Sequence, residues 1–85
     1  MKEIEKILNS ELELSNDQVV EIFKIVGDNG DIIIIKNDGI RKEKPFTVVI
    51  SSSNGKFESI RYDSEALNTA LTYSVRRYLE YVKNE

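Results

Sequence analysis

The run Ile32–Ile35 constrains the fold more than any other stretch of the chain. Four consecutive β-branched side chains are restricted at χ1 and fit a pleated strand better than a helix. Gly30 and Gly39 bound the run, which is shorter than a typical helix. Because side chains alternate between the two faces of a strand, an all-isoleucine strand predicts cover on both faces. We therefore expect Ile32–Ile35 to be the central strand of a small sheet.

Two helices are predicted before this strand. The apolar residues of segment 2–9 recur at helical spacing, which indicates a short helix. Ser15 and Gln18 have the spacing of a capping box, and Leu14 and Val19 occupy the positions of a hydrophobic staple. An apolar stripe with a period of one helical turn follows this cap: Val19, Ile22, Phe23 and Val26.

The second of these helices has an alternative. Gly27 fits the residue just past its C-terminus. The β-branched content of Val19–Val26 would also suit a strand, paired with Ile32–Ile35 through a turn at Gly27–Gly30. In that case the element order, four strands and then a long helix, resembles the PC4-like (whirly) single-strand DNA binders. The resemblance is one of element order, and the capping signals favour the helix.

A hairpin is predicted after the isoleucine run. Asn37-Asp38-Gly39 is a turn signal, and Pro45, which has no N–H to donate, marks a strand start, an edge or a bulge. Phe46, Val48 and Ile50 alternate with less apolar residues, as in a half-buried strand.

Asn54-Gly55 is expected to close this hairpin. A three-residue loop, Ser53–Gly55, with Gly55 in the left-handed conformation, gives the more apolar inner face. The register predicted by that loop pairs Phe46 with Tyr62, Val48 with Ile60 and Ile50 with Glu58.

The hairpin also carries a local resemblance. Lys44-Pro45-Phe46, Val49-Ile50 and Ser53-Asn54-Gly55 resemble the C-terminal hairpin of the phage uracil-DNA glycosylase inhibitor, an acidic DNA mimic. The resemblance covers this hairpin alone. The last helix of the present chain has no counterpart in that family, and no site residue is carried over from it.

A long C-terminal helix completes the predicted fold. Asp63 or Ser64 is expected to cap it, and Ala66 and Ala70 lie beside its apolar stripe. The stripe consists of Leu67, Leu71, Ser74, Val75, Tyr78 and Val82. The predicted class is α+β: a small antiparallel sheet of three or four strands, with the long C-terminal helix packed on one face. One or two short N-terminal helices are expected over the other face or one end.

Composition indicates a binding protein rather than an enzyme. The 85 residues form one domain, 1–85, without cysteine or histidine, which removes the commonest nucleophile–base pairs and metal ligands. We expect no cofactor, no metal site and no catalytic residue. The charged start, Met1–Lys6, lacks the apolar core of a signal peptide, and no apolar run has the length of a membrane span. We therefore expect a cytoplasmic protein.

Charge is unevenly distributed along the chain. Residues 1–31 contain eight acidic and three basic side chains, a balance of −5, whereas residues 32–62 contain six basic and three acidic ones, a balance of +3. Residues 63–85 carry −1, which gives the net charge of −3. Two surfaces of opposite sign are expected from this asymmetry.

The first functional hypothesis is a module that occludes a partner protein, as small inhibitors, immunity proteins and phage or mobile-element anti-defence factors do. The partner would be a nucleic-acid-handling enzyme or a toxin with a basic surface. A homodimer or the partner itself is expected to complete the cover of the core. The predicted contact residues are acidic side chains of the N-terminal segment and tyrosines and an arginine of the last helix: Glu11, Glu13, Asp17, Glu21, Tyr73, Arg77 and Tyr81.

The alternative is a protein that binds single-stranded nucleic acid. Basic strands with nearby aromatic residues can hold phosphates and stack bases, and Phe57, Arg61 and Tyr62 lie near such strands. The overall pI near 5.0 is low for such a protein. The residues predicted to contact nucleic acid are Lys36, Arg41, Lys42, Lys44 and Lys56.

Overall fold

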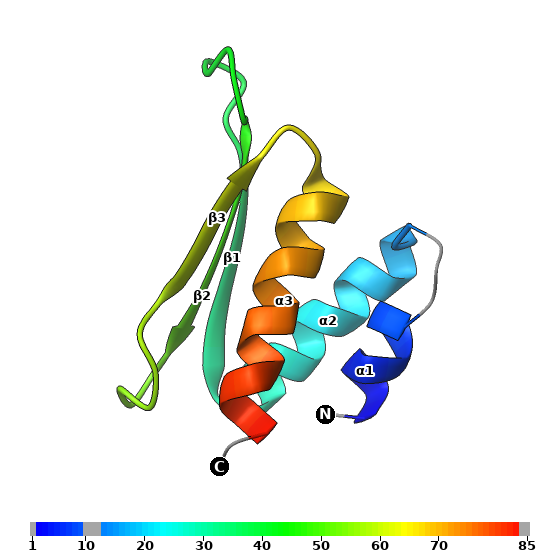
Figure 1. The fold of residues 1–85 in the computed structure, drawn as a ribbon, viewed down its shortest axis with the longest axis vertical. Coiled ribbons are helices and arrows are strands. Elements are labelled where there is room, and N and C mark those ends of the chain that lie inside the picture. The colour runs from blue at the N-terminus through cyan, green and yellow to red at the C-terminus, as the bar shows by residue number, and fades with distance from the viewer. Residues whose placement is uncertain (1, 10–12, 84–85) are drawn as a thin grey trace.

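The computed structural model describes residues 2–9 and 13–83 of the chain. It confirms the predicted class, α+β, with two N-terminal helices, a three-stranded antiparallel sheet and a long C-terminal helix (Figure 1). The elements are α1 (Lys2–Asn9), α2 (Asn16–Asp28), β1 (Asp31–Asn37), β2 (Phe46–Ser52), β3 (Ile60–Ser64) and α3 (Leu67–Lys83).

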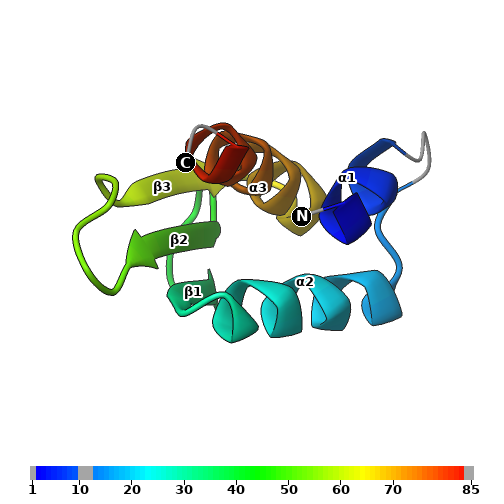
Figure 2. The ribbon, with the colours of Figure 1, turned by 90° about the horizontal axis from the view of Figure 1, so that it is seen from below.

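The sheet has the order β1-β2-β3, and the helices lie on one side of it (Figures 1 and 2). Helix α3 packs against β2 and β3, α2 packs against β1, and α1 packs against α2. Ile32–Ile35 therefore form a strand, as predicted, but this strand is at the edge of the sheet and not at its centre. The prediction that both faces of this strand are covered is wrong, because the N-terminal helices share the side of α3 and leave the other face open.

Val19–Val26 had two predicted conformations, a helix and a strand, and they form part of helix α2. Ser15 Oγ accepts a hydrogen bond from the Gln18 N–H at 3.2 Å, and the Gln18 amide oxygen accepts one from the Ser15 N–H at 2.9 Å, which completes the capping box. The whirly-type element order requires a strand in this segment. Because the segment is a helix, the chain does not have that element order. The helix continues past Gly27 to Asp28, and Gly30 adopts the positive φ of +84° that the turn into β1 needs.

The β2–β3 hairpin keeps the predicted faces but not the predicted register. Val48 pairs with Tyr62 and Ile50 with Ile60, which is a shift of two residues from the prediction. A two-residue shift preserves which side chains face inward, because side chains alternate with a period of two. Gly55 has the expected positive φ of +75°, but the connection is longer than three residues, since β2 ends at Ser52 and β3 starts at Ile60.

Phe57 gives a physical reason for the longer connection. Its ring stacks on Tyr81 of α3, with 5.1 Å between the ring centroids, and meets Tyr78 edge-on at 5.8 Å. The Ser52 hydroxyl closes the turn by accepting a hydrogen bond from the Lys56 N–H at 3.0 Å. Burial of an aromatic ring against α3 thus replaces the tighter hairpin that the local sequence favours.

The core lies between the inner face of the sheet and the helices. Its largest fully buried apolar and aromatic side chains come from every helix and from β2: Ile4, Ile22, Val26, Val48, Ile50, Leu71, Val75 and Tyr78. Helix α3 begins later than predicted, at Leu67, and Ser64 Oγ accepts a hydrogen bond from the Ala66 N–H at 3.3 Å ahead of it. Asp63, the other predicted cap, belongs to β3. In the described part of the chain, helix length and hydropathy exclude a membrane-spanning helix.

Candidate functional site

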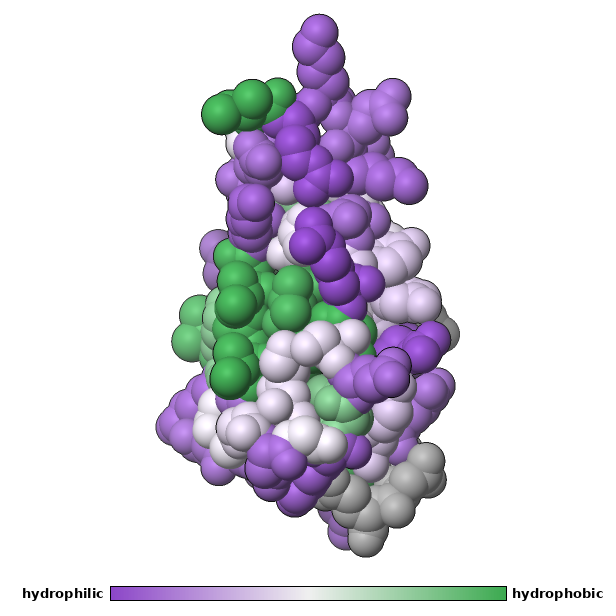
Figure 3. Space-filling view, turned by 90° about the vertical axis from the view of Figure 1, so that its left-hand side faces the viewer, coloured by the Kyte–Doolittle hydropathy of each residue, from purple (hydrophilic) through white to green (hydrophobic). Residues whose placement is uncertain are grey.

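The face of the sheet opposite the helices is the candidate site, and it is called the outer face below. The strand registers place on it side chains from all three strands: Ile32, Ile34, Lys36, Thr47, Val49, Ser51, Arg61 and Asp63. Ile32 and Ile34 are 48% and 52% exposed, although both belong to the most apolar strand of the chain. Figure 3 shows this apolar area at the left of the view, with hydrophilic side chains above and below it.

Alternation along the strands explains how this surface forms. Ile33 and Ile35 point to the inner face and pack against the core, so Ile32 and Ile34 must point away from the helices. Val49 of β2 lies opposite Ile34 and continues the apolar area across the sheet. The result is an apolar area on the open face of the sheet.

A charged cluster borders this apolar area on β2 and β3. The Thr47 hydroxyl donates a hydrogen bond to Asp63 Oδ1, and Arg41 and Arg61 place guanidinium nitrogens 3.5 and 3.6 Å from the same oxygen. Because a hydrogen bond from Thr47 and two nearby positive charges favour the carboxylate, the pKa of Asp63 is lowered from its ordinary value. Arg41 and Asp63 are therefore engaged with each other.

The residues predicted to bind a partner protein fall on two separate parts of the molecule. Glu13, Asp17 and Glu21 are exposed at or near α2, on the β1 side, and Glu11 lies outside the described residues. Tyr73, Arg77 and Tyr81 lie on α3, which packs against β3. The two sets are on opposite edges of the molecule in Figure 2.

The tyrosines of α3 lie beside the aromatic residues of the hairpin. Tyr73 stacks on Tyr62 with 4.0 Å between centroids, and Arg77 Nη1 donates to the Tyr73 hydroxyl at 3.4 Å. Tyr81 stacks on Phe57 and is partly buried. Together with residues of β3 and the preceding loop, these side chains line a shallow pocket of about 200 Å³. The rings are engaged with one another, and the pocket presents mainly polar groups.

The basic residues of the nucleic-acid alternative are also divided. Lys36, Arg41, Lys42 and Lys44 lie in or next to the β1–β2 connection, whereas Lys56 lies in the β2–β3 connection at the other end of the sheet (Figure 1). Within the described strands, no aromatic ring belongs to the outer face, since Tyr62 pairs with inward-facing Val48. The structure therefore does not bring the basic cluster and a stacking platform onto one surface of the described residues.

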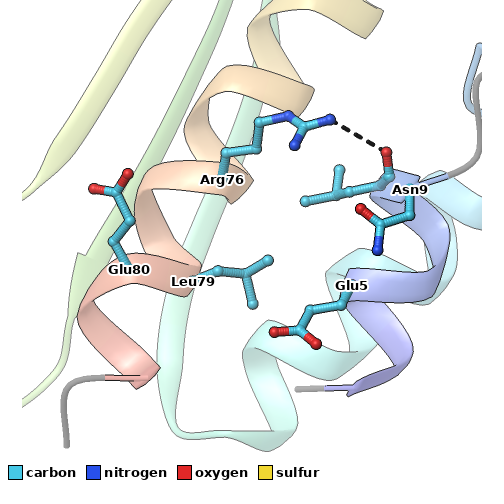
Figure 4. Close-up of a pocket in the computed structure, with 6 residues that line it drawn as sticks. Glu5, Asn9, Arg76, Leu79 and Glu80 are labelled. Atoms are coloured by element: carbon cyan, nitrogen blue, oxygen red, sulfur yellow. Dashed lines mark hydrogen bonds between the residues drawn. The ribbon is translucent and has the colours of Figure 1, made fainter.

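A second hollow lies between α1 and α3 (Figure 4). It has a volume of about 350 Å³. The Arg76 side chain reaches from α3 to α1, where its Nη2 donates a hydrogen bond to the Leu8 carbonyl at 3.2 Å. Leu79 points into the hollow, while the Glu5 and Glu80 carboxylates do not converge on one point (Figure 4). Arg76 thus serves to satisfy the C-terminal end of α1 and to join it to α3.

No acidic cluster suited to a metal ion occurs within residues 2–9 and 13–83. The most suggestive run, Asp28–Asp31, is used structurally. Asn29 Nδ2 donates to Asp31 Oδ2 at 3.2 Å and to the Tyr78 hydroxyl at 2.9 Å. These bonds tie the α2–β1 turn to α3.

Sequence reasoning missed the outer face because it treated four consecutive isoleucines as proof of burial on both sides. The signal that could have indicated an open face lies in β2, whose outward positions include Thr47 and Ser51. Comparison of the chain with protein-family models, with curated proteins and with solved structures found no match.

Proposed function

We propose that this chain is a non-enzymatic protein-binding module that acts by covering a surface of a partner protein. The observation that carries the proposal is the outer face, on which Ile32 and Ile34 are about half exposed on a sheet whose opposite face packs against the helices. Contiguous apolar surface on a folded domain is often an interaction site. Val49 extends that surface onto the neighbouring strand.

Occlusion is the mode of action that this surface supports. A partly apolar sheet face with a charged border has the composition of an interface with an apolar centre and a polar rim. Small inhibitors, immunity proteins and phage anti-defence factors work in this way, because blocking a surface requires no chemistry by the blocking protein. A nucleic-acid-handling enzyme or a toxin is the class of partner that we propose.

The experiment that tests this proposal is site-specific photo-crosslinking in host lysate. A photo-reactive amino acid is placed at Ile34 and, in a matched control, at Val20, which is 65% exposed on α2. We expect a discrete protein adduct from position 34 that survives nuclease treatment and is absent from position 20. Adducts that disappear with nuclease, or that form equally from both positions, would contradict the proposal.

A substitution pair gives an independent measure. Ile34→Lys places a charge in the centre of the apolar area, and we expect it to weaken binding of the crosslinked partner by about tenfold or more, as for a residue at the centre of an interface. Val20→Lys makes the same chemical change on α2 and should leave the affinity unchanged. Equal affinities for the two variants would show that the outer face is not the contact surface.

A further inference from the structure

The free edge of β1 presents a defined set of backbone groups. The Asp38 N–H donates to the Pro45 carbonyl at 2.9 Å, in line with the β1–β2 register. Hydrogen-bonded and non-hydrogen-bonded pairs alternate along an antiparallel ladder, so Ile34 and the other even-numbered residues of β1 bond to β2. The N–H and C=O groups of Ile33 and Ile35 consequently point away from β2, toward the open edge.

The two edges of the sheet differ in how they are protected against pairing with another strand. Strand β3 has five residues and carries Arg61 and Asp63 within it, and a short, charged edge strand resists further pairing. Strand β1 has seven residues, and Ile32–Ile35 contain no charge, proline or bulge. Of the two edges, β1 is therefore the one suited to accept a strand.

The position of α2 decides between a second copy of the chain and a segment of another protein. Figure 2 shows α2 running out from the sheet at the level of β1. Antiparallel pairing of two β1 strands would direct the α2 of the second copy toward the space that the first α2 occupies. An extended segment that carries no such helix meets no such obstacle.

We propose that the free edge of β1 is a strand-addition site for an extended segment of the partner protein, which pairs antiparallel to β1. This inference rests on the proposed function and specifies how the partner binds. Main-chain hydrogen bonds to Ile33 and Ile35 supply affinity, and side chains beside Ile32 and Ile34 on the outer face supply specificity.

Charge complementarity specifies the first residue of that segment. Lys36 follows the four isoleucines on the outer face, whereas the Asp31 carboxylate lies on the inner side and accepts hydrogen bonds from Tyr78 and Asn29. An antiparallel segment therefore fits when its first residue is acidic, opposite Lys36. After it, apolar β-branched residues belong at the positions that face Ile34 and Ile32.

Amide hydrogen exchange with two synthetic peptides tests the proposal. The matched peptide is acetyl-Asp-Thr-Ile-Thr-Val-Lys-amide, and the control, acetyl-Lys-Thr-Ile-Thr-Val-Asp-amide, exchanges the two charges. In the free protein, the amides of Ile34 and Lys36 should exchange slowly and those of Ile33 and Ile35 quickly. At saturating matched peptide, we expect exchange at Ile33 and Ile35 to slow at least tenfold. The control peptide should bind about fivefold more weakly, because the cross-strand ion pair with Lys36 becomes a repulsive pair.

Variants of the full chain complete the design. Ile34→Lys should weaken the matched peptide at least fivefold, whereas Ile40→Lys, which makes the same change at a residue 92% exposed in the β1–β2 connection, should not weaken it. Unchanged exchange at Ile33 and Ile35 under millimolar matched peptide, or equal binding of both peptides, would overturn strand addition. A crosslinked partner whose complex leaves these two amides in fast exchange would overturn strand addition and keep the proposed function. Peptide-induced protection without any protein adduct at Ile34 would leave strand addition standing and contradict the proposed function.

Discussion

The hydroxyl of Tyr78 donates a hydrogen bond to Asp31 Oδ2 at 2.6 Å and joins the centre of α3 to the first residue of β1. The two residues are 47 positions apart in the chain, and the Tyr78 ring is fully buried. The Asn29 side-chain amide donates to both Asp31 and Tyr78, so these hydrogen bonds attach the turn between α2 and β1 to α3.

Tyr78→Phe removes this hydroxyl while keeping the ring. We expect the free energy of unfolding to fall by about 1–2 kcal/mol, because the Asp31 carboxylate and the Asn29 amide lose a partner in a partly buried site. Urea denaturation followed by circular dichroism measures the change. Tyr73→Phe is the control, since its hydroxyl bonds Arg77 at the surface, and it should cost less than half as much.

The capping box of α2 should contribute measurably to stability. Ser15→Ala removes the side-chain acceptor for the Gln18 N–H and is expected to lower the free energy of unfolding by about 1 kcal/mol. Ser15→Asp retains an acceptor at the N-cap and should remain close to the parent protein. Chemical denaturation measures the free energy of unfolding of the parent protein and both variants. An equal loss of stability in Ser15→Ala and Ser15→Asp would show that the side-chain acceptor at the N-cap does not stabilise the helix.

The Thr47–Asp63 contact predicts a particular pH dependence. The pKa of Asp63 is lowered in the folded protein, so its contribution to stability is present above the ordinary carboxyl pKa and is lost as pH falls through the folded-state value. Thr47→Val removes the hydroxyl that contributes most to this shift. An NMR titration should then show the pKa of Asp63 closer to its ordinary value, and the loss of stability that this carboxyl causes in acid should be smaller and complete at a higher pH. An unchanged titration of Asp63 would assign the shift to Arg41 and Arg61 instead.

Ser74 is a buried polar residue that should be replaceable. Its hydroxyl is fully buried and has no hydrogen-bond partner within the described part of the chain. Ser74→Ala removes an unsatisfied polar group, so we expect the free energy of unfolding to stay equal or rise by up to about 1 kcal/mol. Leu71→Ala, at a fully buried position on the same helix, should instead cost about 3 kcal/mol because it leaves a cavity. Thermal unfolding of both variants is the measurement, and a destabilised Ser74→Ala would indicate that the hydroxyl has a partner after all.

The amino-acid sequence by itself determined the local elements. The capping box at Ser15, the turn signal at Asn37-Asp38-Gly39 and the strand start at Pro45 each depend on backbone chemistry within a few residues, and the structure has all three. The extended conformation of Ile32–Ile35 belongs to this group, because restriction at χ1 acts within each residue. The inward faces of β2 and β3 follow from alternation, which survived the two-residue shift of the hairpin.

Only the tertiary structure decided the position of β1 in the sheet, the register of the hairpin and which face of the sheet is exposed. Ile32–Ile35 are at the edge of the sheet because Val19–Val26 form a helix and no strand pairs with the far side of β1 among the described residues. Their outer side is open because α2 and α3 both pack on the inner side, and no local pattern states on which side a helix returns. The hairpin register depends on Phe57 reaching Tyr81, which lies 24 residues further along the chain, beyond any turn rule. The outer face arises from these same long-range choices. Strand propensity is a property of single residues, whereas exposure is a property of their neighbours in space.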